Sequence, residues 1–457
     1  MFKRLKEIKT HVIIVTFLVG TFFGINISGQ SRAEDEFAHK YLDYFHQVYQ
    51  TLKTNFVEVP NNKNFFYGAI KGAIASLNDP YSRFLDEEAF AALKEETTGK
   101  FVGIGIEVTI RDGEIIVISP IEDTPAMKAG ILSEDIIIKV DNVATKEKEL
   151  SDIIKMIKGL PHTKVKLTIR RVGFDEPLDI TVERVPIKIE TVAYGLLKEY
   201  DKVGYLKIKV FSADTPRDIE EALNNFKKKG IEKIIVDLRG NPGGLLDKAI
   251  TITDYFLDRG QLIVSTRGRE GTANVSEFRS EMEPLYKGKL IVLVNNGSAS
   301  ASEIFSGAIK DNKRGKLVGV KTFGKGSVQK FFNLNENIGV TLTIAKYYTP
   351  SGISIHGKGI VPDYIVKADE ISKEDTEKIR IIYKEKIVDK FAKSNKEYTR
   401  ENINKFVEYL KEKKLSISEK NAAFVLKREI NKYGKTPLYD LDFDNQLVEA
   451  VKIISTI

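Results

Sequence analysis

Continuous apolar runs and amphipathic segments alternate along the middle of this 457-residue chain. The apolar runs at residues 233–238 and 289–294 lack strict polar alternation, which is typical of strands covered on both faces of a sheet. Apolar positions with a helical period occupy residues 216–229 and 245–257. Alternating strands and helices of this kind predict a layered α/β domain, which we place at residues 187–370.

The same domain contains further strand patterns toward its end. Short apolar strands are predicted at residues 261–266 and 316–321. A hairpin is predicted from residues 327–334 and 339–348, because a polar turn, Asn335-Glu336-Asn337, separates two β-rich runs.

Residues 101–186 have a different pattern, in which short strands are separated by little helix. Gly103-Ile104-Gly105-Ile106 opens the first strand, and such a glycine loop can expose backbone N–H groups to a terminal carboxylate. The edge of that strand could accept a peptide as an added strand. The strand order and the TPAMKAGI turn at residues 124–131 resemble a circularly permuted PDZ domain, which we assign to residues 96–186. Its strands are expected at residues 101–110, 113–121, 134–142, 163–171 and 178–184.

The chain begins with basic residues, Lys3, Arg4, Lys6 and Lys9, and residues 12–31 carry no charge. This pattern predicts a signal or membrane anchor at residues 1–33. Because an arginine interrupts the small residues at 31–33, we favour a retained single-pass anchor over secretion after signal removal. A buried core helix is the remaining interpretation. An anchor of this kind places the folded body outside the cytoplasm.

Helical patterns flank the two predicted domains. Residues 34–95 contain two helical runs, at 34–58 and 64–77, and their aromatic stripe indicates either packing on the body or formation of a homodimer. Residues 371–457 are helical and rich in lysine and glutamate, and their role is left open by the sequence.

Composition excludes several classes of function. The net charge of +7 comes from 71 basic against 64 acidic residues, a mixed surface that disfavours nucleic-acid binding. The chain has no cysteine and five histidines without His-x-x-x-His spacing, so we expect no metal site. There is no glycine-rich nucleotide motif, and we expect no cofactor.

Three serines, Ser298, Ser300 and Ser302, lie where a strand gives way to a helix. The run from Ser300 to Glu303 has the spacing of a capping box, which is a purely structural interpretation. A serine at a helix start also lies beside free N–H groups and the positive end of the helix dipole, which could stabilise an oxyanion. The sequence alone does not choose among the three serines.

Lys325 lies between two glycines in Phe323-Gly324-Lys325-Gly326. It is either a surface lysine or a partly buried amine, and desolvation disfavours the charged form of an amine. A neutral amine near a serine hydroxyl can take its proton in place of histidine. Gln329 could orient that amine through its carbonyl, but four residues of straight strand span about 13 Å, so the chain has to bend at Gly326.

A second oxyanion donor is expected in residues 238–244, LRGNPGG, which end one of the buried strands. Asn-Pro-Gly-Gly is a strong turn signal in itself. Its place at the end of a strand of an α/β sheet is also where active sites form.

Four motifs in order resemble the carboxy-terminal processing (tail-specific) serine proteases: residues 238–244, 295–312, 323–329 and 347–363. The resemblance implies an α/β fold, namely a crotonase-like protease core with an inserted PDZ domain and helical N- and C-terminal extensions. It implies Ser300 as nucleophile, Lys325 as general base and Gln329 as the residue that orients the lysine. It also implies an oxyanion hole formed by the amide of Ala301 and that of Gly243 or Gly244. The helical extensions resemble those of Gram-positive sporulation-type members, which dimerise.

The expected function is an extracytoplasmic serine endopeptidase whose PDZ domain binds the C-terminal tails of protein substrates. Residues 103–106 would receive the tail, and Arg170 or Arg171 could link tail binding to the alignment of the catalytic loops. Two other interpretations remain: a non-catalytic peptide-binding scaffold, and a crotonase-type acyl transferase.

Overall fold

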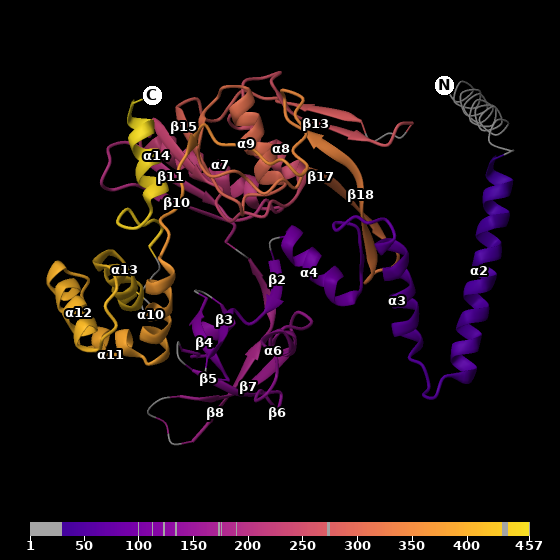
Figure 1. Ribbon diagram of the computed structural model, residues 1–457, viewed down its shortest axis with the longest axis horizontal. Coiled ribbons are helices and arrows are strands. Elements are labelled where there is room, and N and C mark those ends of the chain that lie inside the picture. The colour runs from indigo at the N-terminus through magenta and orange to yellow at the C-terminus, as the bar shows by residue number, and fades with distance from the viewer. Residues whose placement is uncertain are drawn as a thin grey trace, which may run out of the picture. The chain divides into compact units, whose positions relative to one another are not determined.

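The computed structural model describes residues 30–456, except residues 99, 112, 122–123, 133–134, 172–173, 175, 189, 272–274 and 432–436. Its contacts divide the chain into two units, with the boundary between Asn78 and Asp79 (Figure 1). The predicted anchor at residues 1–33 lies almost entirely outside the described residues. None of the described helices contains an apolar stretch long enough to cross a bilayer.

The N-terminal unit is a pair of helices, α2 (Gln30–Asn55) and α3 (Asn62–Ala75), as the sequence predicts. Asn61 caps α3, because its side chain accepts a hydrogen bond from the amide of Asn64 at 3.1 Å. Aromatic rings from both helices meet between them: Phe45 and Tyr49 of α2 contact Phe65 and Phe66 of α3.

The second unit is organised around a sheet in the order β10-β11-β12-β15-β16-β19. β10 is antiparallel to β11, and the pairs from β11 to β19 are parallel. The strands are β10 (Val192–Leu196), β11 (Val203–Ile208), β12 (Lys233–Asp237), β15 (Lys289–Val294), β16 (Lys316–Gly319) and β19 (Tyr364–Ile365). The buried strands predicted around residues 233–238 and 289–294 are confirmed.

Helices cover both faces of this sheet, which explains the continuous apolar strands. In β12, Ile234 and Val236 belong to the core formed with α7 (Thr215–Lys228), α8 (Leu246–Asp254) and α9 (Ala301–Asp311). The intervening Ile235 packs on the other face against α14 (Asn445–Thr456). Figure 1 shows α14 on the side of the sheet opposite α7, α8 and α9.

A second sheet extends from this core in the order β1-β18-β13-β14, with β17 also paired to β18. The predicted hairpin is present as β17 (Ser327–Asn333) and β18 (Gly339–Tyr348). The other strands are β1 (Arg83–Leu85), β13 (Leu262–Gly268) and β14 (Ser276–Arg279). β1 and the following helix α4 (Glu87–Thr98) belong to the second unit, whereas the sequence prediction grouped residues 34–95 together.

The PDZ segment forms its own sheet in the order β3-β4-β5-β7-β8, with β6 paired to β5. Its first predicted strand, residues 101–110, is wrong as a single element. The strand is broken into β2 and β3 because Gly105 has a positive φ of 84°. β2 instead pairs with β9 where the chain enters and leaves the segment. The elements are β2 (Lys100–Gly103), β3 (Ile106–Arg111), β4 (Glu114–Pro120), α5 (Pro125–Lys128), β5 (Ile136–Val140), β6 (Val143–Ala144), α6 (Leu150–Ile157), β7 (Lys164–Arg170), β8 (Leu178–Glu183) and β9 (Val185–Lys188).

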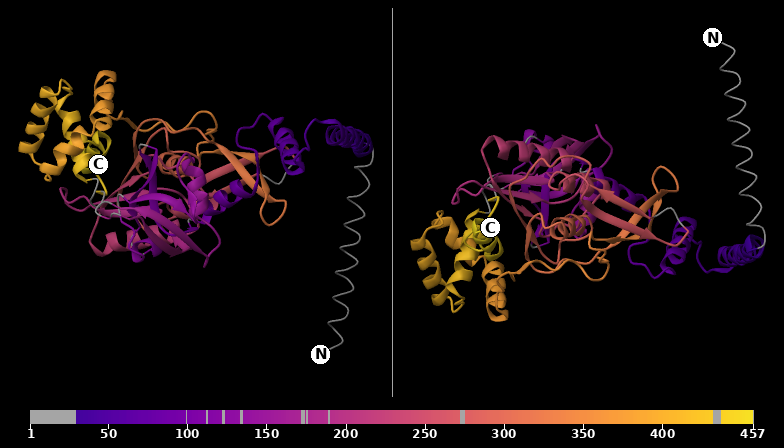
Figure 2. Two further views of the ribbon diagram at one scale, coloured as in Figure 1. Left: turned by 90° about the horizontal axis from the view of Figure 1, so that it is seen from below. Right: turned by 90° about the horizontal axis from the view of Figure 1, so that it is seen from above.

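The C-terminal residues form two structures with different packing. A small helical bundle has its own apolar core, centred on Phe406 and Leu426, and it appears as one orange-to-yellow cluster in both views of Figure 2. The last helix, α14, instead covers a face of the sheet that contains β12 and β15. The bundle helices are α10 (Lys373–Lys384), α11 (Ile387–Ser394), α12 (Arg400–Glu412) and α13 (Glu419–Ile430).

Candidate active site

Two turns meet at the carboxyl ends of neighbouring parallel strands. β12 and β15 are paired in register, so the turn at residues 238–244, the glycine turn, lies beside the turn at residues 295–300, the serine turn. The amide of Gly240 donates to Asn295 Oδ1 at 2.9 Å, and the amide of Ala299 donates to the carbonyl of Asn241 at 3.0 Å. The sheet register and these bonds therefore bring two of the predicted motifs together.

Ser300 is the N-cap residue of α9, with φ 54° and ψ −112°. This backbone conformation is unfavourable for a non-glycine residue and is tolerated where the surroundings enforce it, commonly at functional sites. The hydroxyls of its neighbours bond to the backbone of the adjacent turn: Ser298 to the carbonyl of Leu238 at 2.8 Å, and Ser302 to that of Asn241 at 3.0 Å. Of the three serines, Ser300 is the one that lines the cavity described below.

Glu303, in the first turn of α9, joins the serine turn to the loop at residues 320–326, which carries Lys325. Its buried carboxylate accepts hydrogen bonds from the amides of Ser300 and Lys325 at 2.9 and 2.8 Å. It also accepts from the amide of Gly324 at 2.7 Å and the hydroxyl of Thr322 at 2.6 Å. Burial raises the pKa of the Glu303 carboxyl above its usual range, and these hydrogen bonds oppose the increase.

Lys325 lies in the loop between β16 and β17 and is partly buried. The backbone passes so close to residues 355–357 that a Cβ at Gly326 would lie 2.2 Å from the amide nitrogen of His356. A glycine at position 326 is therefore required by close packing, as the sequence suggested. The Nζ atom of Lys325 lies 5.2 Å from the centroid of the Tyr81 ring.

Gln329 is held by its amide nitrogen, which donates to the hydroxyls of Ser327 at 2.8 Å and Thr343 at 3.3 Å. The β17–β18 register shifts between Val328 and Gln329, so the strand is irregular at this residue. Because the amide nitrogen makes both of these bonds, the side-chain carbonyl is left as the group that can accept from an amine.

The predicted oxyanion donors lie against the serine. A Cβ at Gly243 would lie 2.8 Å from Cβ of Ser300 and 2.9 Å from the amide nitrogen of Ala301. The Gly243 amide itself donates to Asn241 Oδ1 at 2.8 Å. Among the described hydrogen bonds none uses the amide of Gly244 or Ala301, so this pair is the better candidate for an oxyanion hole.

A cavity of about 390 Å³ unites these groups. Ser300, Lys325, Gln329 and Gly244 line it, together with residues from β1, α4, β17 and β18. Tyr347 also lines it, and burial raises the pKa of its phenol, which keeps the group neutral at neutral pH. The other lining residues are Pro80, Tyr81, Arg83, Leu93, Thr97, Pro242, Leu245, Leu246, Phe331 and Thr341.

Comparison with known proteins identifies the family. Residues 202–366 match the model of peptidase family S41, residues 116–171 that of a PDZ domain, and residues 24–89 that of the activating protease CtpB N-terminal domain. A carboxy-terminal-processing protease of Bartonella bacilliformis is 40% identical over 363 residues, which cover 78% of this chain and 82% of the relative. The chain belongs to the carboxy-terminal processing proteases of peptidase family S41.

Two further proteins are similar to this chain. Carboxy-terminal processing protease CtpA of Bacillus subtilis is 36% identical over 362 residues, covering 78% of this chain and 76% of the relative. A solved structure titled photosystem II D1 C-terminal processing protease is 29% identical, covers 71% of this chain and 86% of its own, and superposes with a TM-score of 0.43.

In this family member, the residues predicted to receive a tail lie at the start of the PDZ sheet. Gly103 ends β2, Ile104 and Gly105 form the connection, and Ile106 begins β3, which is an edge strand. The carbonyls of Ile104 and Gly105 accept hydrogen bonds from the amide of Ala126 and the hydroxyl of Thr124 at 2.9 and 3.1 Å. The connection is thus fixed against the start of α5, and β3 keeps an open edge.

The two PDZ arginines pair within the PDZ domain. Arg170 forms an ion pair with Glu114, and Arg171 makes two hydrogen bonds of 2.7 Å to Asp135. The bonds to Asp135 raise the pKa of Arg171. A link from either arginine to the catalytic loops stays a prediction, because these partners belong to the PDZ domain itself.

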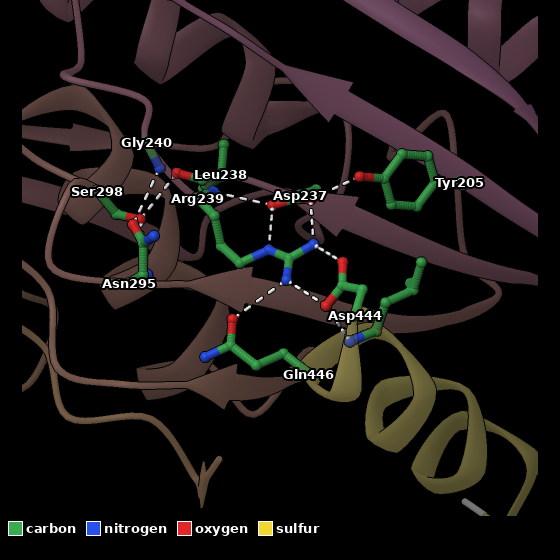
Figure 3. A network of polar contacts seen from close by, with 10 residues as sticks. Tyr205, Asp237, Leu238, Arg239, Gly240, Asn295, Ser298, Asp444 and Gln446 are labelled. Atoms are coloured by element: carbon green, nitrogen blue, oxygen red, sulfur yellow. Dashed lines mark hydrogen bonds and ion pairs between the residues drawn. The ribbon is translucent and has the colours of Figure 1, made fainter. Parts of the chain in front are cut away.

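Sequence reasoning missed several residues around the protease site. Asn241 ties the glycine turn to the serine turn, Tyr81 faces Lys325, and Arg239 connects the glycine turn to α14 (Figure 3). The motif LRGNPGG contains the first and last of these, but nothing in it identifies their partners. Among the described residues, no group of acidic or histidine side chains could hold a metal ion.

Proposed function

We propose that this chain is a serine endopeptidase that uses a Ser300–Lys325 dyad and forms an acyl-enzyme. The observation that supports this most directly is the single cavity lined by Ser300, Lys325, Gln329 and Gly244. A strained serine at a helix N-terminus, a partly buried amine and backbone donors are the groups that acyl transfer needs.

The reaction follows from this arrangement. The neutral amine of Lys325 takes the proton of the Ser300 hydroxyl as the oxygen attacks the scissile carbonyl. The amides of Gly244 and Ala301 donate to the oxyanion, and the lysine returns the proton to the leaving amine. Water then attacks the acyl-enzyme with Lys325 again acting as base. The acyl C–O bond to Ser300 breaks, and the lysine returns the proton to the serine oxygen, while Gln329 holds the amine through its carbonyl.

The substrates that we propose are protein C-terminal tails, presented by the PDZ domain. The connection at residues 103–105 would receive the free carboxylate and the open edge of β3 the tail backbone. Support comes from the PDZ match and from the relatives named as carboxy-terminal processing proteases.

We further propose that residues 12–31 are retained as a single membrane anchor with the catalytic body outside the cytoplasm. The uncharged run, preceded by four basic residues, supports this orientation.

We also propose that the N-terminal helices join two copies of the chain, because α2 exposes a row of aromatic residues.

Catalysis is tested on a folded protein that carries a disordered apolar tail with a free carboxylate. We expect Ser300→Ala and Lys325→Ala each to reduce kcat by at least about 10³-fold. Lys321→Ala is the matched control, because this exposed lysine lies in the same loop. Ser302→Ala should still react with a serine-directed phosphonate, whereas Ser300→Ala should not.

The competing interpretations give different results in the same experiment. Cleavage by Ser300→Ala at the wild-type rate would refute the dyad. Tail binding by the wild type without cleavage or labelling would indicate a scaffold, and binding of coenzyme A would indicate an acyl transferase.

A further inference from the structure

The turn that carries Gly243 and Gly244 is attached to α14 through the side chain of Arg239. All five N–H groups of this guanidinium are used, which is the full capacity of an arginine. They donate to the carboxylate of Asp237 at 2.9 and 2.7 Å, to that of Asp444 at 2.7 and 2.6 Å, and to Oε1 of Gln446 at 3.1 Å. Figure 3 shows the guanidinium between the two carboxylates.

The cluster of Arg239, Asp237 and Tyr205 is buried, so a change in its geometry would leave buried charges without their partners. The Arg239 side chain is 15% exposed and that of Asp237 1%. Burial opposes ionisation of both groups, but their hydrogen bonds outweigh it. The bonds to Asp444 and Asp237 raise the pKa of Arg239, and those from Arg239 lower the pKa of Asp237. Burial, with the neighbouring Asp237, raises the pKa of Tyr205, so its hydroxyl stays protonated and donates to Asp237 at 2.5 Å.

Asp444 has a second role in the same place. It precedes α14 and accepts a hydrogen bond from the amide of Leu447 at 2.9 Å, which is the geometry of a helix cap. A carboxylate at this helix end is also favoured by the helix dipole. Capping fixes the Asp444 carboxylate on α14, and the two bonds to Arg239 fix the arginine on the carboxylate.

The opposite side of the glycine turn is attached to the serine turn. The hydroxyl of Ser298 bonds the carbonyl of Leu238, and Asn295 bonds the amide of Gly240. Arg239 lies between Leu238 and Gly240 in the chain, so a shift of its backbone moves both of these contacts (Figure 3). The turn is thus held between α14 on one side and the serine turn on the other.

We infer that Asp444 is a positioning residue of the protease site: through Arg239, the C-terminal helix sets the position of the turn whose glycine amide receives the oxyanion. This inference rests on the proposed function. The C-terminal helix is then a part of the catalytic apparatus, although it follows Ser300 by more than a hundred residues and does not line the cavity.

The test measures cleavage of a tailed protein by full-length Asp444→Asn, Arg239→Gln and the double variant. We expect kcat to fall about tenfold or more in each single variant, because displacement of a donor by about 1 Å can cost up to 10²-fold. KM should change less than about twofold, since the tail binds at the PDZ domain. If Asp444 acts through Arg239, the double variant should be no slower than Arg239→Gln alone.

Controls separate positioning from a general loss of folding. Asp442→Asn removes the same charge two residues away, where the carboxylate is 58% exposed and pairs with Lys427, and it should keep wild-type kcat. Arg239→Lys keeps the positive charge but lacks the planar fork, so we expect a folded protein with reduced kcat. Hydrogen exchange of residues 238–245 should become faster in Asp444→Asn, a result that needs no enzymatic activity.

The outcomes are distinguishable. Absence of Ser300-dependent cleavage in the wild type would refute the proposed function, whatever the variants do. With an active wild type, unchanged kcat and exchange in folded Asp444→Asn would overturn the inference, and so would effects that multiply in the double variant.

Discussion

Glu303 is the residue on which the relative positions of the serine and lysine depend most directly. One of its carboxylate oxygens accepts from the amides of both Ser300 and Lys325, so the two segments share a single buried acceptor. A sequence with S-x-x-E spacing predicts the first bond as half of a capping box. The second bond exists only in the folded core, where the glycine loop reaches the start of α9.

We expect Glu303→Gln to impair both stability and catalysis. The amide group has one oxygen, so in either orientation its NH₂ would face at least one backbone N–H group, and each unsatisfied buried donor costs about 1–3 kcal/mol. We therefore expect a loss of about 2–4 kcal/mol in the free energy of unfolding and a fall of at least about 100-fold in kcat. Urea unfolding and cleavage assays measure the two effects, with Glu336→Gln in the exposed β17–β18 turn as control.

The pH dependence of this effect has a definite sign. Because the pKa of Glu303 is raised in the folded state, its contribution to stability is present below the ordinary value of 4.5 and is lost as pH rises through the folded pKa. Glutamine does not titrate, so the difference in unfolding free energy between wild type and Glu303→Gln should narrow as pH rises from 4 to 7. A difference that widens over this range would contradict the raised pKa.

Short sequence patterns could predict which turns form the candidate site. They could not predict which of several similar residues in each turn faces the cavity. Strand ends, glycines and an S-x-x-E box locate the turns, because their causes are local. Choosing Ser300 over Ser298 and Ser302, or Gly244 over Gly243, needs the partners of each group across the fold. The contact between Arg239 and Asp444 likewise depends on residues that are distant in the sequence and whose local patterns carry no sign of it.

At the scale of elements, the PDZ segment shows how one residue changes a strand. The apolar run at residues 101–110 predicts one strand, but the positive φ of Gly105 divides it into β2, which pairs with β9, and the edge strand β3. β1 was not predicted, because its three residues are too few to show the alternation of apolar and polar positions that indicates a strand. The long buried strands were predicted well, since their pattern follows from coverage on both faces.

We expect Gly105→Ala to weaken tail recognition without affecting the chemistry. A Cβ at Gly105 would lie 2.3 Å from Cβ of Thr124, so the connection that offers its amides to a carboxylate has to shift. We expect KM for a tailed protein to rise about tenfold or more, while labelling of Ser300 by a small phosphonate stays at the wild-type rate.

Gly113→Ala is the matched control for this prediction. Gly113 lies in the same domain at a similar φ of 77°, but a Cβ there meets nothing within 4 Å. Its KM should stay near that of wild type. Equal KM values for Gly105→Ala and wild type would exclude this connection as the tail site, and amidation of the substrate carboxylate should remove the difference between the two alanine variants.

At the scale of the whole molecule, the sequence predicted which kinds of domain the chain contains. Four ordered motifs and a strand order were sufficient for a protease core with a PDZ domain, which the family matches support. The predicted C-terminal region, residues 371–457, is one helical stretch by composition. Its last helix nevertheless packs on the protease sheet, because Leu447, Val451 and Ile454 form an apolar stripe that fits the open face.

The N-terminal unit carries a row of exposed aromatic side chains on α2. Along α2, the side chains of Phe37, Tyr41 and Tyr44 are 63%, 52% and 47% exposed. Exposed aromatic residues in a row are unusual on a soluble surface and mark interaction sites. Each large side chain buried at an interface contributes about 1.5–3 kcal/mol, and a symmetric dimer buries every such residue twice.

The full-length chain in detergent should therefore be dimeric at micromolar concentration. We expect the double variant Phe37→Glu, Tyr41→Glu to raise the dissociation constant at least about 100-fold, because charges replace apolar contacts in both copies. Gln50→Glu, at an exposed polar position on another face of the same helix, adds a charge outside this row and should leave the mass of the assembly unchanged. Sedimentation equilibrium measures all three. A dimeric double variant would place the interface elsewhere, and a monomeric wild type would leave the aromatic row without a second copy to explain it.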